Sequence, residues 1–458
     1  MGKNTEIQSL QLCDFSLMKQ YLLNEKEEKK NKKDSEDTEN TDDDLDEKFK
    51  TAIVDDKEQT ISNFKMEPPG IFIGRGKNPN LGKLKKRIYP EDVTINISKD
   101  AEIPETIEGH KWGKVMHDRH VEWLASWKDT VIGKTKYLWL AAHSDMKTNS
   151  DIEKFDLARK LKKKIKRISE QNELNMKSDD LKIRQIATAM FFIDKLAIRV
   201  GNEKSDDEAD TVGASNLRVE HIDLSEKNKL TLNFLGKDSV PYTNTITVDP
   251  LIYDNVNDFI QGKDSDDQIF HLITSNDINK YLQEFMKNLT AKVYRTYNAS
   301  NVFQKELNKI TKKYTDPDMQ QNDNKKAILD DFSKANAKVA KIMNHQKNIS
   351  TGYKKTVTKI TDAINLLKKK LAKARRATKK NPVTIQKLKD KIKSVKSKME
   401  LVKEMKNISL NTSKANYIDP RITVAFMKTH NLDINKLFSK ALQEKFKWAF
   451  EVKADFKF

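Results

Sequence analysis

Five side chains of this 458-residue chain have the chemistry needed to cleave a phosphodiester without a metal ion. Such cleavage needs a nucleophile, cationic donors for the non-bridging oxygens where charge builds, and an acid that protonates the leaving sugar oxygen. A phenol can serve as the nucleophile, and the planar guanidinium fits phosphate oxygens. Cationic neighbours would lower the pKa of the phenol from about 10. The candidates are Arg199, Lys237, Arg295, His345 and Tyr417.

Each candidate also has a simpler structural interpretation. Arg199 could cap the C-terminus of a helix, Lys237 could be a polar hairpin residue, and His345 could be a hydrogen-bonded, half-buried imidazole. Most tyrosines pack their ring and leave the hydroxyl in water. Singly, these interpretations are the commoner ones. The chemical role is favoured only if all five residues lie in motifs that match one family.

The elements that would position these residues are of mixed type. Residues 51–148 contain a Pro- and Gly-rich stretch and alternating strands near 92–98, 121–127 and 136–142, which predicts a compact β-rich part. Two helices are expected over 150–204, the second ending near Gly201. A three-strand meander with Lys237 in its tight turn follows, and then helices to about residue 345.

A lysine-rich segment separates His345 from Tyr417. Residues 353–406 hold seventeen Lys and two Arg against four acidic residues. Narrow apolar seams at alternating spacings of 4 and 3 predict an antiparallel coiled-coil hairpin with a short Pro-containing loop. A solvated spacer and a DNA-facing element both fit such a hairpin. The seam residues are Tyr353, Val357, Ile360, Ile364, Leu367, Leu371 and Ala374, then Ile385, Leu388, Ile392, Val395, Met399 and Val402.

Composition limits the class of protein. The net charge of +18 indicates a polyanionic partner, most commonly nucleic acid. Cys13 is the one cysteine, so a reducing compartment is expected, and no zinc-ligand spacing occurs. No apolar run is long enough for a membrane span. Residues 34–47 carry nine acids and no base, which predicts a disordered, solvated linker.

Several motifs together resemble the signatures of eukaryotic-type DNA topoisomerase I, the type IB family. They are FIDKLAIRVGNEK, ADTVGASNLRVEHI, FLGKDS, LTAKVYRTYNAS, NHQ and TSKANYIDPRITVAF. ISNFKMEPPGIFIGRGKNPNLGKLKKR resembles the β-rich clamp segment of that family, and the C-terminal run is similar to its ending. The resemblance covers about residues 50–458 in the order of the family.

The resemblance implies a role for each candidate. Tyr417 would form a 3′-phosphotyrosine bond, while Arg199, Arg295 and His345 would hold the scissile phosphate. Lys237 would be the general acid toward the 5′-hydroxyl. Weaker candidates for DNA contact near the cleavage site are Arg75, Asp238 and Asn416. The basic run KLKKR, which includes Lys85, Lys86 and Arg87, fits phosphate contact or nuclear import.

The implied fold class is a multidomain α+β protein. It would comprise a β-rich clamp, a mainly helical catalytic domain with the meander, a coiled-coil linker and a small helical C-terminal domain. We expect a cap-lobe remnant with the acidic linker at 1–50, the clamp at 51–148, the catalytic domain at 149–346, the linker at 347–408 and the C-terminal domain at 409–458.

The main departure from the family lies at the front, where only the tail of a substantial cap lobe is recognisable. A true start at Met1, an incomplete gene model and a partner chain that supplies the lobe are three explanations. The expected activity is relaxation of supercoils in double-stranded DNA by a nuclear or organellar monomer that needs no ATP, metal or other cofactor. The alternatives are an inactive, truncated DNA-binding form and, less favoured, a tyrosine recombinase, which lacks the long charged hairpin.

Overall fold

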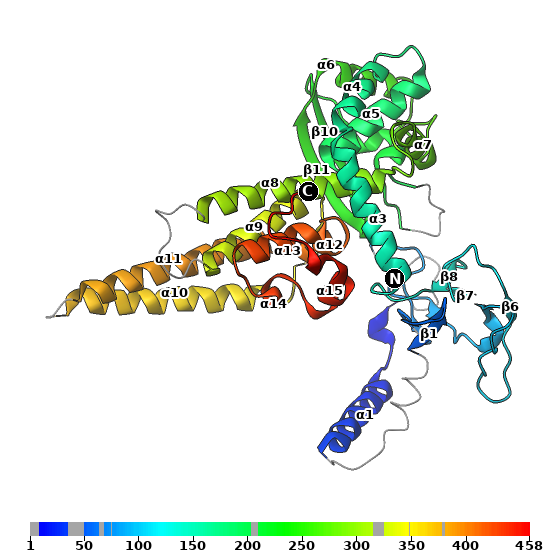
Figure 1. The fold of residues 1–458 in the computed structure, drawn as a ribbon, viewed down its shortest axis with the longest axis horizontal. Helices are drawn as coiled ribbons and strands as arrows, with labels where there is room; N and C mark the ends of the chain where they lie inside the picture. Colours follow the sequence, from blue (N-terminus) through cyan, green and yellow to red (C-terminus); the bar gives the residue numbers. More distant parts are fainter. Residues whose placement is uncertain are drawn as a thin grey trace. The chain divides into compact units, whose positions relative to one another are not determined.

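The computed structural model describes residues 9–34, 50–63, 68–74, 76–202, 209–314, 325–347, 349–377 and 381–458. Most of the acidic run at 34–47 lies outside these ranges, so its predicted disorder is not addressed. The chain divides into two compact units (Figure 1). Unit 1 comprises Met1–Ile152 and Glu203–Thr211, and unit 2 comprises Glu153–Asn202 and Val212–Phe458.

Unit 1 begins with a 3-10 turn, η1 (Leu10–Leu12), and the helix α1 (Ser16–Asp34). Two antiparallel strand pairs follow, β1 (Thr51–Val54) with β2 (Lys57–Thr60), and β3 (Gly70–Ile71) with β4 (Leu84–Lys85). Asp55 and Asp56 connect β1 to β2 with φ of 48° and 60°. Two successive positive φ angles are the geometry of a tight hairpin turn, and Asp tolerates them better than most residues.

A four-stranded sheet forms the core of unit 1. Its order is β6 (Lys114–Met116), β5 (Val93–Asn96), β7 (Ala125–Lys128) and β8 (Thr135–Leu138), with η2 (Pro90–Asp92) before β5. Only the β5–β6 pair is parallel within this sheet. The alternation in sequence buries Val93, Ile95, Ala125 and Trp127 on one face. The β-rich segment and its three expected strands are therefore confirmed.

Three helices precede the meander, where two had been expected. They are α3 (Asp145–Lys162), α4 (Ile165–Asn175) and α5 (Leu181–Leu196). Asp180 caps the N-terminus of α5, and its carboxylate accepts the Lys182 and Ile183 amides. It supplies buried core residues such as Phe192 and Ile193. In the described residues no helix is long and apolar enough to cross a membrane.

The predicted three-strand meander is present in unit 2. It runs β9 (Ile222–Asp223), β10 (Lys229–Gly236) and β11 (Val240–Thr247), all antiparallel, with β10 in the middle. The short turns η3 (Ala214–Asn216) and η4 (Val219–His221) lead into it, and η5 (Lys237–Ser239) joins its two long strands. Leu230, Leu232 and Phe234 alternate on the face that joins the main core.

Helices complete the part of unit 2 that precedes the hairpin. They are α6 (Pro250–Ile260), α7 (Ser275–Phe285), α8 (Ala291–Tyr314) and α9 (Lys325–Ile342). Helix α8 carries buried side chains along most of its length, from Ala291 to Ile310. Such a helix is enclosed by neighbours on several sides. It therefore offers a rigid place from which a polar side chain can be aimed.

The coiled-coil hairpin consists of α10 (Tyr353–Arg376) and α11 (Pro382–Glu404), which lie side by side (Figure 1). Within α10 all seven predicted seam residues are at least partly buried, and every other residue is exposed. All six seam residues predicted in α11 are likewise shielded. The lysines off the seam thus face solvent, and the predicted seam is confirmed.

The base of the hairpin is closed by backbone hydrogen bonds. The amide of Lys347 donates to the Asn407 carbonyl at 2.8 Å, and the amide of Ser409 donates to the His345 carbonyl at 2.7 Å. Gln346 and Ile408 form an isolated antiparallel bridge between them. The chain therefore enters and leaves the hairpin at one place.

The C-terminal segment is helical, as expected. It comprises α12 (Leu410–Asn416), α13 (Pro420–Thr429), α14 (Ile434–Leu437), α15 (Lys440–Lys445) and η7 (Lys447–Glu451). Val424, Phe438, Leu442 and Phe446 form a small core with Phe155 of α3. Tyr417, Ile418 and Ile422 instead join the main core. Hydrophobic burial therefore fixes the segment that carries Tyr417 against the main core of unit 2.

Candidate active site

The backbone of Tyr417 is held at the end of α12. Its amide donates to the Ser413 carbonyl at 2.9 Å. Its carbonyl accepts the hydroxyl of Ser300 on α8 at 3.0 Å, and the same oxygen of Ser300 accepts the Asp419 amide at 3.0 Å. The tyrosine side chain is only 5% exposed. The hydroxyl of Ser300 on α8 thus binds the backbone at both Tyr417 and Asp419.

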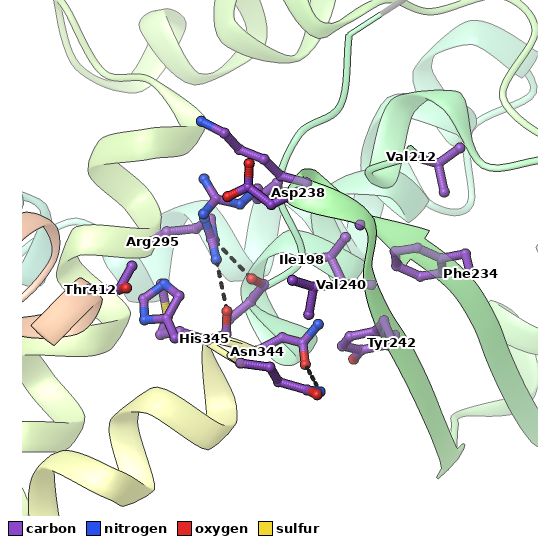
Figure 2. A pocket seen from close by; sticks show the side chains of 16 residues that line it. Ile198, Val212, Phe234, Asp238, Val240, Tyr242, Arg295, Asn344, His345 and Thr412 are labelled. Carbon is purple, nitrogen blue, oxygen red and sulfur yellow. Dashed lines mark hydrogen bonds between the residues drawn. The ribbon is translucent and has the colours of Figure 1, made fainter. Parts of the chain in front are cut away.

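Arg295 is the most deeply fixed cation of the site. It lies on α8, is 3% exposed, and donates from Nη1 to the Tyr417 hydroxyl at 2.9 Å. Nε donates to the Ala197 carbonyl at 2.8 Å and Nη2 to the Met343 carbonyl at 3.3 Å. Figure 2 shows these two backbone bonds as dashed lines. All three nitrogens of the guanidinium are therefore engaged, and its orientation is set before any ligand arrives.

Arg199 reaches the same hydroxyl from a different segment, at 3.0 Å from Nη1. The expectation that its helix ends near Gly201 was wrong. Helix α5 ends at Leu196, and Ala197 takes the left-handed conformation with φ of 51°. Arg199 consequently lies in a non-helical segment beyond the cap, so its side chain can turn back toward Tyr417 instead of following the helix.

Gly201 has another task in this segment. With φ of 86°, it passes so close to Gly213 that a Cβ on Gly213 would come within 2.4 Å of its backbone nitrogen. The Ala214 amide also donates to the Arg199 carbonyl at 2.7 Å. This close approach of two backbone segments, which needs glycine in both, holds the segment that carries Arg199.

The two guanidinium groups change the acidity of the phenol between them. Burial by itself raises the pKa of Tyr417, but the charges of Arg295, Arg199 and Lys292 and the hydrogen bond from Arg295 lower it more. The result is a pKa below the ordinary value of 10. Burial lowers the pKa of Arg295 to about 10, which still leaves it charged at neutral pH. The site therefore makes loss of the phenol proton easier than in an ordinary tyrosine, and the phenolate is the nucleophilic form.

His345 follows helix α9 and lies beside the tyrosine ring, with centroids 5.1 Å apart. Its Nδ1 is 2.7 Å from the Ser413 hydroxyl. Burial, with Arg295 and Arg199 nearby, lowers the pKa of His345 to about 3, so the imidazole is neutral at physiological pH. Its Nε2 is buried and has no hydrogen-bond partner among the described residues. An uncommitted ring nitrogen beside two arginines is suited to a ligand oxygen.

A cavity of about 600 Å³, including its open mouth, adjoins these groups. Arg199, Lys237, Asp238, Arg295 and His345 all line it. Figure 2 shows Asp238, Arg295 and His345 among the lining side chains. Asp238 and Ser239 in the turn have φ of 67° and 55°, so the tight hairpin presents Lys237 at the cavity wall. The structure thus brings the five principal candidates to one place, four of them lining a cavity beside Tyr417. Their roles stay predictions.

Sequence comparisons identify the family of the chain. Residues 143–378 match the family profile described as eukaryotic DNA topoisomerase I, catalytic core. Residues 1–140 match its DNA binding fragment, and residues 389–458 match the C-terminal topoisomerase domain. The chain belongs to the eukaryotic DNA topoisomerase I family.

Named relatives span all or nearly all of the chain. It is 41% identical over 485 aligned residues to DNA topoisomerase 1 beta of Arabidopsis thaliana, covering 100% of this chain and 52% of that protein. Identity is 40% with DNA topoisomerase 1 of Caenorhabditis elegans, over 97% of this chain and 57% of the relative. Identity is 39% with DNA topoisomerase 1 of Homo sapiens, over 97% of this chain and 61% of the relative. The chain thus spans about half to three-fifths of the length of these topoisomerase I relatives.

The remaining DNA-contact candidates of this topoisomerase I family member are less tightly placed. Asn416 is exposed, and its amide donates to the Thr412 carbonyl of its own helix at 3.1 Å. Lys86 and Arg87 are exposed and Lys85 is partly buried, all in unit 1. Arg75 lies outside the described residues. Among the described residues, no group of three His, Cys, Asp or Glu side chains could hold a metal ion.

Sequence reasoning missed the groups that orient the candidates. They are the hydroxyls of Ser300 and Ser413 and the carbonyls of Ala197 and Met343. Ser413 left a signal, because it precedes Tyr417 by four residues, one helical turn, in the topoisomerase motif TSKANY. The backbone carbonyls leave no such signal in the sequence, since every residue type has a carbonyl.

Proposed function

We propose that this chain is an ATP-independent DNA topoisomerase that relaxes supercoils through a transient 3′-phosphotyrosine bond. The observation that carries the proposal is the Tyr417 hydroxyl, which accepts hydrogen bonds from Arg295 at 2.9 Å and Arg199 at 3.0 Å. Membership of the eukaryotic DNA topoisomerase I family supports it. Double-stranded DNA is the proposed substrate, and the nucleus is the proposed location.

In the proposed cleavage step, the oxygen of Tyr417 attacks phosphorus and the bond from phosphorus to the 5′-oxygen of the leaving strand breaks. The phenol proton is lost to solvent, and Lys237 gives a proton to the leaving oxygen. The arginines that contact the phenol would also hold the non-bridging oxygens as negative charge develops there. Because Arg295 is fixed by two backbone carbonyls, little reorganisation is needed at the transition state.

Religation is the same step reversed. The 5′-hydroxyl attacks the phosphotyrosine, Lys237 accepts its proton, and Tyr417 leaves as a phenolate that the arginines stabilise. The phosphoester bond keeps the free energy of the broken phosphodiester, so each cycle is close to isoenergetic. Superhelical tension therefore drives relaxation without nucleotide hydrolysis.

The hairpin of α10 and α11 would act on the DNA while the strand is open. Its exposed lysines form a charged surface on both helices. Attraction between such a surface and a rotating duplex is long-ranged and weakens as salt is added. We propose that this attraction slows rotation, so that relaxation is controlled.

The direct test uses the full chain on plasmids of either superhelical sign, without ATP and with EDTA, at low salt. Relaxation of both signs is expected. A nicked suicide substrate labelled 5′ of the break should remain attached to wild-type protein and not to Tyr417→Phe. Tyr281→Phe is a matched control, because it removes another buried phenol hydroxyl, one bonded to Asn172 and Asn175.

Failure to relax either plasmid would refute the activity for this chain. DNA binding without an adduct would instead indicate an inactive DNA-binding protein. An adduct that persists in Tyr417→Phe would refute the assignment of the nucleophile.

A further inference from the structure

Ser413 touches both the histidine and the tyrosine of the site. Its hydroxyl lies 2.7 Å from His345 Nδ1, and its backbone carbonyl accepts the Tyr417 amide at 2.9 Å. The residue is fully buried, at 0% exposure. It lies in α12, across the base of the hairpin from His345. We propose that Ser413 is a positioning residue, whose hydroxyl holds His345 in the tautomer that carries its proton on Nε2.

The hydrogen-bonding options of the pair support this assignment. A neutral imidazole has one donor and one acceptor nitrogen, and a hydroxyl can donate or accept. If the Ser413 hydroxyl donates to Nδ1, that contact is satisfied and Nε2–H is the one donor of the pair left without a partner among the described residues, free to meet a ligand. If Nδ1–H donates instead, no bond found among the described residues takes up the hydroxyl proton of Ser413, and Nε2 presents only a lone pair. The first arrangement leaves one buried polar group unpaired and the second leaves two, and each unpaired group is costly, so the first is favoured.

The first arrangement also matches what the cavity must bind. The inference rests on the proposed function, in which a phosphate with negatively charged oxygens occupies the site. Nε2–H would donate to such an oxygen, whereas a bare lone pair would repel it. Burial beside Arg295 and Arg199 lowers the pKa of His345 to about 3, so a second proton is not available to make both nitrogens donors. The tautomer therefore decides whether His345 attracts or repels the phosphate oxygen.

The histidine tautomer can be observed directly in the full chain. With 15N-labelled histidine, long-range 1H–15N spectra distinguish protonated from unprotonated ring nitrogens, and His345→Gln identifies the signal. We expect wild-type His345 to carry its proton on Nε2, and Ser413→Ala to show a mixture of tautomers. A wild-type signal with the proton on Nδ1 would overturn the proposal, whether or not the chain cleaves DNA.

Single-turnover cleavage of a suicide substrate supplies the functional test. Ser413→Ala should slow cleavage by about 10- to 100-fold, the effect of losing one hydrogen bond to a charged group. Its affinity for DNA should be unchanged, and Ser413→Thr, which keeps a hydroxyl, should restore much of the rate. Ser333→Ala is the matched control, since that serine on α9 bonds only to the Leu329 carbonyl of its own helix in the described structure.

A double-mutant cycle separates positioning from general packing. In a His345→Gln background, Ser413→Ala should cause little further loss, because Ser413 acts through His345. A further tenfold loss in that background would contradict the proposal and indicate a structural role. If wild type forms no adduct at all, the proposed function fails, while the spectra still decide the tautomer.

Discussion

The guanidinium of Arg295 contacts the Tyr417 hydroxyl at 2.9 Å although the two residues are 122 positions apart in the chain. The guanidinium carbon of Arg295, Cζ, also lies 4.9 Å from the centre of the Tyr417 ring. The cation therefore contacts both the oxygen and the π face of the same side chain. Two backbone carbonyls complete its coordination, so Arg295 is a structural as well as a chemical part of the site.

The two arginines should consequently differ when each is replaced by alanine. Arg295→Ala leaves buried carbonyls without donors and should destabilise unit 2 by about 2–5 kcal/mol. Arg199 is only partly buried, so Arg199→Ala should leave thermal stability nearly unchanged. Each should slow cleavage by about 100- to 1,000-fold. Thermal unfolding and suicide-substrate kinetics check this, and equal loss of stability in both variants would contradict it.

Acid should destabilise the fold partly through His345. Its pKa is about 3 in the folded chain, against 6.5 as the ordinary value. Below pH 6.5 the unfolded chain therefore binds a proton that the folded chain refuses, so stability falls as the pH drops from 6.5 toward 3. The slope approaches about 1.4 kcal/mol per pH unit for one such group.

Denaturant midpoints measured from pH 7 to pH 4 test this effect. His345→Gln should flatten the decline relative to wild type. Burial also lowers the pKa of His430, so wild type and variant will share a residual slope, and only the difference between them reports on His345. Identical slopes would show that His345 is not protected from protonation.

Cleavage should depend on pH through Tyr417. The lowered phenol pKa means that the rate rises with pH and levels off below pH 10, the value of an ordinary tyrosine. Arg199→Gln removes one of the charges that lower it, so the plateau should move to higher pH. Single-turnover rates between pH 6 and 10 provide the measurement. An unchanged midpoint in the variant would mean that Arg199 does not set the acidity of the phenol.

The hairpin should contribute to DNA affinity through charge alone. Lys368, Lys369 and Lys370 on α10 are all exposed. Replacing the three with Gln should weaken DNA binding and reduce the slope of log affinity against log salt by up to about 0.9 for each phosphate that is no longer neutralised. Replacing them with Arg should preserve both. A salt titration of DNA binding decides between these outcomes, and equal slopes in all three proteins would exclude a role for these lysines in holding DNA.

Sequence periodicity predicted the parts of the fold that depend on local patterning. The seams of α10 and α11 were predicted residue by residue, since burial in a two-helix hairpin follows the spacing of apolar residues. The meander and the turn that carries Lys237 were predicted for a similar reason. The end of α5 was not, because Ala197 adopts the left-handed conformation without the glycine that usually signals it.

The sequence predicted which residues belong to the candidate site, but not how they are arranged. Residues with distinctive chemistry, such as Tyr417 and Arg295, can be recognised by type and motif. The Ser300 hydroxyl and the Met343 carbonyl gain their tasks only when distant segments meet. Tertiary contacts of that kind have no local pattern.

The closed base of the hairpin has a consequence for how the site forms. His345 and Ser413 are 68 residues apart in sequence, a separation that makes their encounter entropically expensive. The helices between them form mainly local contacts, and once they pair, the Gln346–Ile408 bridge brings the flanking segments together. The effective loop is then a few residues long. The lysine-rich insertion therefore shortens the conformational search by which histidine and tyrosine find each other.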